Sequence, residues 1–280
     1  MIPTMCEGGK LSRLLVGDFT LRRFVRSAIL IVALTYVGLG LYGYLFTDRL
    51  AFQPPPPTYR EGEQILKLKA SDGVAISAVH LLNPDALFTI LYAHGNAEDL
   101  GDVRPGLEEL RRLGFSVFAF DYRGYGTSAG TPSEQGAYAD IDAAYSYLTG
   151  RLHVPAHRII VYGRSLGGAV AIDLATRQPV AGLIVESSFV SGFRVLTRIP
   201  LFPFDKFRSI EKITRVRYPV LVIHGRKDRV VSFWHGERLF REAHEPKMSL
   251  WVDGAGHDDV PEAGAERYAD ALRKFRDLLR

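Results

Sequence analysis

Cysteine is almost absent from this 280-residue chain, which contains only Cys6. A single cysteine excludes an intrachain disulfide and any metal site built on several thiolates. The eight histidines are scattered, and no His-x-x-x-His or Glu-x-x-His pair marks an expected helix, so no metal ion is expected. The Gly124-x-Gly126 motif lacks a third glycine, which argues against a nucleotide site. The sequence therefore predicts chemistry without a metal or a cofactor.

The net charge is also small over most of the chain. The formal charge is +4, but residues 1–46 hold five basic and two acidic residues and so carry +3 of it. Residues 47–280 are left with +1. A nucleic-acid-binding domain needs a concentrated basic surface, so nucleic acid is not expected as a partner.

Residues 27–46 contain no charged residue. Twenty helical residues rise about 30 Å, which matches the hydrocarbon core of a bilayer. The segment is longer than the apolar region of a cleaved signal, and no small-x-small cleavage site follows it, so we expect a single transmembrane anchor rather than a buried core helix. Three arginines lie just before it and only Arg49 lies just after it. This asymmetry predicts a cytoplasmic tail over residues 1–26 and an extracytoplasmic domain, which in a bacterium would be periplasmic.

Four consecutive prolines, residues 54–57, predict a stiff linker over 47–60 between the anchor and a domain over 61–280. In that domain, apolar β-branched runs alternate with amphipathic helical patterns after an initial hairpin. This alternation predicts an α/β fold with a mainly parallel, eight-stranded sheet and helices on both faces. The expected strands are 65–69, 74–82, 87–93, 116–120, 158–161, 180–185, 219–223 and 248–252. The expected helices are 102–113, 134–148, 166–177, 233–243 and 261–279.

The alternation stops over about residues 188–217, where a phenylalanine-rich insert precedes the next strand. We interpret the insert as a small helical lid or as one wall of an acyl pocket. Phe189, Phe193 and Phe202 are the candidate pocket residues. The alternative is an apolar segment that packs over the edge of the sheet and contacts no substrate.

The most informative motif is Gly163-x-Ser165-x-Gly167, between the strand that ends at Val161 and the helix that begins at Leu166. In this strand–turn–helix context the motif predicts a nucleophile elbow, in which the serine sits on a strained turn with its hydroxyl exposed. Glycine is required at the flanking positions because a Cβ there would collide with the neighbouring strand or helix. The start of the helix also directs free N–H groups and its positive dipole end toward the serine.

Polar loops follow four other expected strands, at the edge of the sheet where reactive groups gather. They are His94-Gly95-Asn96-Ala97 and the segments 121–128, 224–231 and 253–257. With the elbow, these loops resemble the α/β-hydrolase superfamily, whose triad runs in the order Ser, Asp, His. The motifs His-Gly-Asn-Ala, Asp-Tyr-Arg-Gly-Tyr-Gly-x-Ser and Gly-Arg-Ser-Leu-Gly-Gly are similar to those of the membrane-anchored serine hydrolases related to eukaryotic protein depalmitoylases and their bacterial counterparts. The resemblance covers about residues 60–280.

The resemblance implies a catalytic triad of Ser165, Asp228 and His257. His257 would take the proton of Ser165 during attack, and Asp228 would fix the orientation of His257. The backbone N–H groups of Leu166 and Asn96 would form the oxyanion hole.

Neighbouring residues are candidates for other roles. Glu186 ends the preceding strand and is the main alternative to the expected acid. His94 and Gly95 are expected to shape the oxyanion loop, and glycine allows that loop to approach the serine closely. His224 is expected to be buried beside the acid loop, and His235 is expected on the surface of a helix.

The leading hypothesis is a membrane-anchored serine hydrolase that cleaves a carboxylic ester or thioester through an acylated Ser165. Its substrate would be a small molecule or a lipid-like acyl compound. The alternatives are a serine peptidase or amidase on the same fold, and a non-catalytic scaffold on a hydrolase fold. Peptidases with this triad usually carry a larger cap than the insert could form. The sequence leaves the oligomeric state and the natural substrate open.

Overall fold

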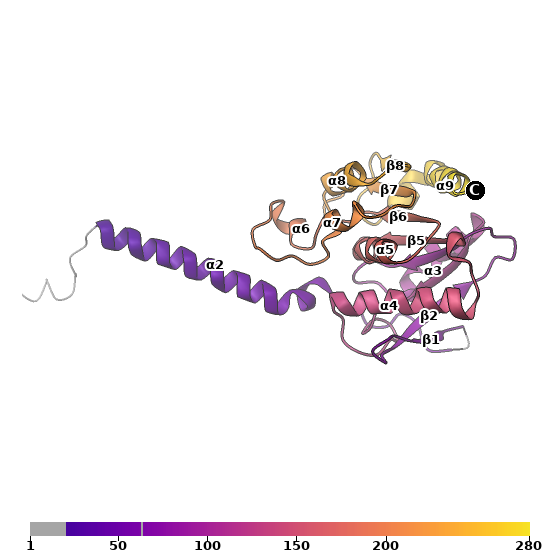
Figure 1. The fold of residues 1–280 in the computed structure, drawn as a ribbon, viewed down its shortest axis with the longest axis horizontal. Helices are drawn as coiled ribbons and strands as arrows, with labels where there is room; N and C mark the ends of the chain where they lie inside the picture. Colours follow the sequence, from indigo (N-terminus) through magenta and orange to yellow (C-terminus); the bar gives the residue numbers. More distant parts are fainter. Residues whose placement is uncertain (1–20, 63) are drawn as a thin grey trace, which may run out of the picture. The chain divides into compact units, whose positions relative to one another are not determined.

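The computed structural model describes residues 21–62 and 64–280, which form an apolar helix and a globular unit (Figure 1). The division between the two compact units falls between Thr47 and Asp48. Helix α2 (Leu21–Ala51) includes the predicted span 27–46 and extends beyond both of its ends. Among the described helices it alone is long and apolar enough to cross a bilayer, and most of its side chains are exposed. This length and composition fit a membrane anchor.

Eight strands form a single sheet in the order β1-β2-β4-β3-β5-β6-β7-β8. β1 pairs antiparallel with β2, and β2 pairs antiparallel with β4. All the other neighbouring pairs are parallel. The strands are β1 (Leu66–Lys69), β2 (Ala75–Leu81), β3 (Thr89–Ala93), β4 (Ser116–Phe120), β5 (Ile159–Arg164), β6 (Gly182–Glu186), β7 (Val220–Gly225) and β8 (Lys247–Val252). The prediction of a mainly parallel, eight-stranded sheet is confirmed.

Helices cover both faces of this sheet, as Figure 1 shows. They are α3 (Leu100–Arg112), α4 (Glu134–Ser146), α5 (Leu166–Arg177), α6 (Arg194–Thr197), α7 (Ser209–Ile213), α8 (Trp234–Glu242) and α9 (Val260–Leu278). One hydrophobic cluster joins the sheet to α4, α5 and α8, and a second cluster joins it to α3 and α9. The central strands are buried along their whole length, which is why their sequences are apolar on both faces.

The segment just after α2 packs against the globular unit, within the residues 47–60 for which the sequence predicts a stiff linker. Phe52 is only 4% exposed and belongs to the hydrophobic core, so the globular unit already begins at Asp48. Thr58 and Tyr59 donate hydrogen bonds from their hydroxyls to Asp99 and Asp121. The four prolines have no N–H group to donate, but the residues on either side of them have both apolar and polar partners in the domain.

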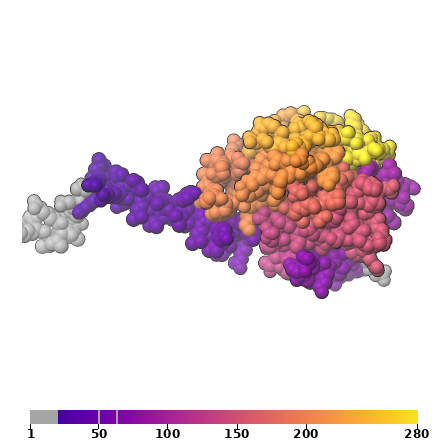
Figure 2. Space-filling model, in the orientation of Figure 1, coloured from indigo at the N-terminus to yellow at the C-terminus, as the bar shows by residue number. Residues whose placement is uncertain are grey.

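The insert over about 188–217 contains the short helices α6 and α7. Phe207 is buried in the core, whereas Leu196 is 87% exposed and Ile199 is 59% exposed. Figure 2 shows the insert in orange as part of the surface of the globular unit. The insert is therefore packed at its base and exposed at its tip, and its function as a lid stays a prediction.

Candidate active site

Ser165 occupies the sharp turn between β5 and α5. Its backbone has φ 52° and ψ −116°, a conformation that costs a non-glycine residue about 1–3 kcal/mol. Its N–H donates to the carbonyl oxygen of Glu186 at 2.8 Å, which holds the turn against β6. A Cβ on Gly163 would lie 2.1 Å from the carbonyl oxygen of Gly167, and a Cβ on Gly167 would lie 2.0 Å from that of Ala93. The turn therefore requires both glycines.

His257 lies between Ser165 and Asp228, as the resemblance implies. Its Nε2 is 3.1 Å from Ser165 Oγ, and its Nδ1 is 2.7 Å from Asp228 Oδ2. With Nδ1 protonated, the imidazole donates to the carboxylate and accepts the serine hydroxyl proton at Nε2. The His257 side chain is 10% exposed, while the Asp228 side chain is fully buried. The geometry is that of a nucleophile, a base and an orienting acid.

Asp228 is held as a carboxylate by donors on both oxygens. The backbone N–H groups of Val230 and Val231 donate to Oδ1 at 2.9 and 2.8 Å, and His224 Nε2 lies 3.2 Å from Oδ2. Burial acts to raise the Asp228 pKa, but the hydrogen bonds from His224 and His257 outweigh burial and hold that pKa well below its usual value. Asp228 thus stays ionised at neutral pH. His224 is buried beside the acid loop as predicted.

The alternative acid, Glu186, is engaged elsewhere. It is buried and accepts hydrogen bonds from the hydroxyls of Tyr162 and Tyr268. Burial raises its pKa, although those hydrogen bonds and the nearby Arg164 partly oppose the shift. The structure therefore brings Asp228, and not Glu186, against His257.

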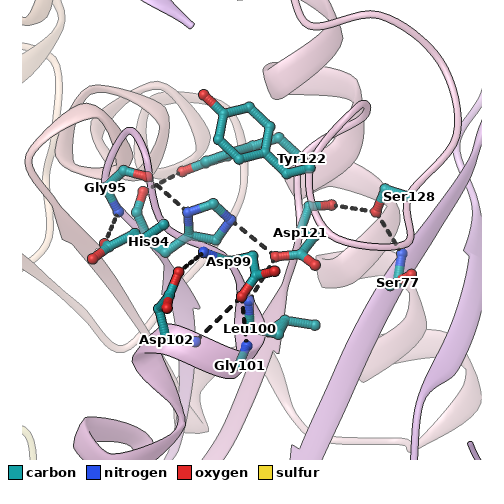
Figure 3. A network of polar contacts seen from close by, with 12 residues as sticks. Ser77, His94, Gly95, Asp99, Leu100, Gly101, Asp102, Asp121, Tyr122 and Ser128 are labelled. Carbon is teal, nitrogen blue, oxygen red and sulfur yellow. Dashed lines mark hydrogen bonds and ion pairs between the residues drawn. The ribbon is translucent and has the colours of Figure 1, made fainter. Parts of the chain in front are cut away.

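The His94–Ala97 loop follows β3 and lies against Ser165, because a Cβ on Gly95 would be 3.4 Å from Ser165 Cβ. His94 is fully buried, with Nδ1 2.7 Å from the Gly95 carbonyl oxygen and Nε2 3.3 Å from Asp121 Oδ1 (Figure 3). The Tyr122 hydroxyl donates to the His94 carbonyl oxygen at 2.8 Å. These contacts hold the start of the loop in place, and the role of this loop in an oxyanion hole stays a prediction.

Arg164 joins two of these loops and was missed by sequence reasoning. It forms ion pairs with Glu98, at 2.6 Å in the connection between β3 and α3, and with Asp258, which adjoins His257. Glu98 in turn accepts a hydrogen bond from the Gly95 N–H. Arg164, Glu98 and Asp258 also line a cavity of about 240 Å³. The position of Arg164 directly before the serine is the signal that could have identified it.

Comparison with known proteins decides the family. The family model for serine aminopeptidases (S33) matches residues 84–202. Alpha/beta hydrolase domain-containing protein 17B of Xenopus tropicalis is 37% identical, over 81% of this chain and 89% of the relative. The related protein aho-3 of Caenorhabditis elegans is 38% identical, over 82% and 77%. The chain belongs to the α/β-hydrolase family. The resemblance to depalmitoylase-like serine hydrolases inferred from the motifs is confirmed.

Solved structures agree with the fold of this α/β-hydrolase. The Pyrococcus furiosus esterase Pf2001 superposes with a TM-score of 0.67 at 20% sequence identity, over 80% of this chain and 98% of the esterase. The esterase domain of a Rhodothermus marinus protein gives a TM-score of 0.59 at 20% identity, over 76% and 97%. At this level of identity the similarity shows the fold alone.

The three phenylalanines predicted to line an acyl pocket lie in two places. The rings of Phe193 and Phe202 are in edge contact, with centroids 6.1 Å apart, and the Phe193 ring also meets Phe204. Phe189 is buried in the core and packs against Phe207. Their contribution to an acyl pocket stays a prediction.

One predicted surface position is wrong. His235 is fully buried, its ring stacks on Trp234, and its Nδ1 accepts a hydrogen bond from the Val190 N–H at 3.2 Å. The helical pattern alone did not show that the insert covers this face of α8. Within residues 21–62 and 64–280, no three His, Cys, Asp or Glu side chains are grouped to hold a metal ion.

Proposed function

We propose that this α/β-hydrolase is a serine hydrolase that cleaves a carboxylic ester or thioester. The observation that carries the proposal is the line of contacts from Ser165 Oγ through His257 to Asp228, at 3.1 and 2.7 Å. Ser165 Oγ attacks the substrate carbonyl carbon while His257 Nε2 takes the hydroxyl proton. The negative charge that develops on the carbonyl oxygen is stabilised by the backbone N–H groups of Leu166 and Asn96.

The tetrahedral intermediate then collapses to an acyl-serine. His257 gives its proton to the departing alcohol or thiol, and the carbonyl double bond reforms. A water molecule, deprotonated by the same imidazole, attacks the acyl-serine, and the carboxylic acid leaves as Ser165 regains its proton. The lowered pKa of Asp228 supports this cycle, because an ionised Asp228 stabilises the imidazolium that forms in each half.

We further propose that the enzyme works at a membrane on an acyl substrate of lipid-like character. Helix α2 is long and apolar enough to serve as the anchor. The exposed apolar tip and the aromatic cluster of the insert support an apolar acyl group as ligand. The arginines before the span support a cytoplasmic tail and a catalytic domain on the opposite side of the membrane.

Hydrolysis of a peptide or amide bond is the second candidate, favoured by the description of the matching family model as serine aminopeptidases. The same triad geometry serves acyl transfer from amides. Turnover of aminoacyl p-nitroanilides, compared with p-nitrophenyl esters under the same conditions, separates the two candidates.

The function is tested by assaying the detergent-solubilised full chain with p-nitrophenyl esters and matching thioesters of increasing acyl length. We expect turnover by the wild type, with the preferred length measuring the pocket. The Ser165→Ala variant is expected to lose at least about 10⁴-fold in kcat, because the nucleophile is removed. Equal turnover by Ser165→Ala and the wild type would refute the assignment.

A further inference from the structure

The segment Phe52–Tyr59, here called the strap, lies against the oxyanion loop of the hydrolase unit. Phe52 begins the strap and is buried among aromatic rings. Its ring centroid lies 6.4 Å from those of Tyr122 and Tyr125 and 5.8 Å from that of Phe207. The strap is therefore fixed to the core at the residue that directly follows helix α2.

The next residue of the strap contacts the proposed oxyanion residue itself. The Gln53 N–H donates to Asn96 Oδ1 at 2.9 Å and lies 3.1 Å from the Tyr125 hydroxyl oxygen. The Tyr125 hydroxyl donates to the same Asn96 Oδ1 at 2.6 Å. Two donors therefore hold the Asn96 side chain, one of them from the strap. Holding the side chain restricts the backbone of Asn96, whose N–H is the proposed oxyanion donor.

The far end of the strap holds both ends of the same loop. The Thr58 N–H donates to Asp99 Oδ2 at 2.8 Å, and Asp99 caps the start of α3 by accepting from the Gly101 N–H at 2.9 Å. The Tyr59 hydroxyl donates to Asp121, the carboxylate that pairs with His94. Figure 3 shows His94, Asp99 and Asp121 in one network of polar contacts. The loop from His94 to Asp99 is thus connected to the strap at its beginning, middle and end.

We propose that the strap is a positioning element that sets the Asn96 N–H of the oxyanion hole, so that catalysis depends on the segment joining the anchor helix to the domain. The inference rests on the proposed function. An oxyanion donor acts only when it is aimed at the charge that develops in the transition state, so a small displacement lowers kcat more than it changes substrate binding. Loss of the Gln53 hydrogen bond is expected to change kcat and to leave KM nearly constant.

The test compares Gln53→Pro with Gln53→Ala in the full chain. Proline removes the N–H that binds Asn96, whereas alanine keeps that N–H and changes the side chain alone. We expect Gln53→Pro to lower kcat for p-nitrophenyl butyrate about tenfold, with KM within about twofold of the wild type, and Gln53→Ala to retain the wild-type kcat. The rate of acylation of Ser165 by a fluorophosphonate should fall in parallel with kcat.

Tyr125→Phe provides a second variant in case proline disturbs folding. It keeps the buried ring and removes the other donor to Asn96, and a fall in kcat of about threefold is expected. Equal kcat values for the wild type, Gln53→Pro and Tyr125→Phe would overturn the inference while leaving the serine-hydrolase function intact. A loss of activity that only follows the unfolded fraction, measured by circular dichroism at the assay temperature, would overturn it as well. Absence of labelling in the wild type would instead count against the proposed function.

Discussion

At the carboxyl ends of the parallel strands, the pairs His257–Asp228 and His94–Asp121 differ in the group that the second imidazole nitrogen faces. In one pair, His257 Nδ1 is 2.7 Å from Asp228 and Nε2 faces the Ser165 hydroxyl. In the other, His94 Nε2 is 3.3 Å from Asp121 and Nδ1 faces the carbonyl oxygen of Gly95. A hydroxyl can give its proton to an imidazole, whereas a carbonyl oxygen can only accept one.

The two pairs also differ in how readily the imidazole can bind a second proton. Both nitrogens of His94 face oxygen acceptors, so its imidazolium form is favoured. Burial acts to lower the His94 pKa, but the nearby Asp121 carboxylate and the charge of Glu98 outweigh burial and raise it. His94 therefore holds the loop through contacts with two oxygen acceptors, while His257 Nε2 faces a hydroxyl that can give it a proton. Under the proposed function, the group at the free nitrogen distinguishes the pair that acts in catalysis from the pair that holds a loop.

The largest expected difference is the effect of Asp228→Asn on catalysis. The amide would leave His257 in the wrong tautomer and would not stabilise its imidazolium, so kcat should fall by about 10⁴-fold. Steady-state hydrolysis of a p-nitrophenyl ester measures the change. Glu186→Gln is the matched control, because Glu186 ends the neighbouring strand and binds tyrosines rather than His257. A larger loss in Glu186→Gln than in Asp228→Asn would reverse the assignment of the acid.

Asp121→Asn should lower stability more than it lowers kcat, whereas Asp228→Asn should act mainly on kcat. Replacing the buried Asp121 carboxylate by an amide weakens its contact with His94, which should lower the free energy of unfolding by about 1–3 kcal/mol. The fall in kcat should be about tenfold, because the oxyanion loop is displaced but the triad remains. Urea denaturation and ester hydrolysis on the same samples check both values. A 10⁴-fold loss of kcat at unchanged stability would make Asp121 a catalytic residue and remove the distinction between the pairs.

His235 is a third buried histidine, and among the described residues no carboxylate forms an ion pair with it. Burial, followed by the charges of His224 and Arg194, lowers its pKa from 6.5 to about 4. Between these values the unfolded chain binds a proton that the folded chain does not, so stability falls as the pH drops from 6.5 to 4, by about 3 kcal/mol in total.

His235→Asn tests this contribution to acid sensitivity. The amide oxygen can replace Nδ1 as the acceptor for the Val190 N–H, but it does not titrate in this range. Denaturation at pH 6.5 and pH 4 should show about 3 kcal/mol less loss of stability in the variant than in the wild type. An identical loss in both proteins would mean that His235 does not remain neutral in the folded state.

The sheet could be predicted from the sequence because the pattern of apolar residues marks each strand. The reactive loops could then be predicted because loops that follow parallel strands lie at the same edge of the sheet. Ser165, Asp228 and His257 each follow a strand, so the topology alone brings them together. The strap was not predicted, because a run of prolines is typical of a spacer and nothing local shows that Phe52 enters the core. His235 and Arg164 were misjudged or missed for a related reason, since their partners come from segments distant in sequence.

The most direct test of the central claim is the site at which a fluorophosphonate reacts with the full chain. Peptide mapping by mass spectrometry should find one adduct on Ser165, with labelling abolished in Ser165→Ala and slowed strongly in Asp228→Asn. An adduct at another serine, or undiminished labelling of Ser165→Ala, would contradict the assignment of Ser165, His257 and Asp228 as the catalytic machinery.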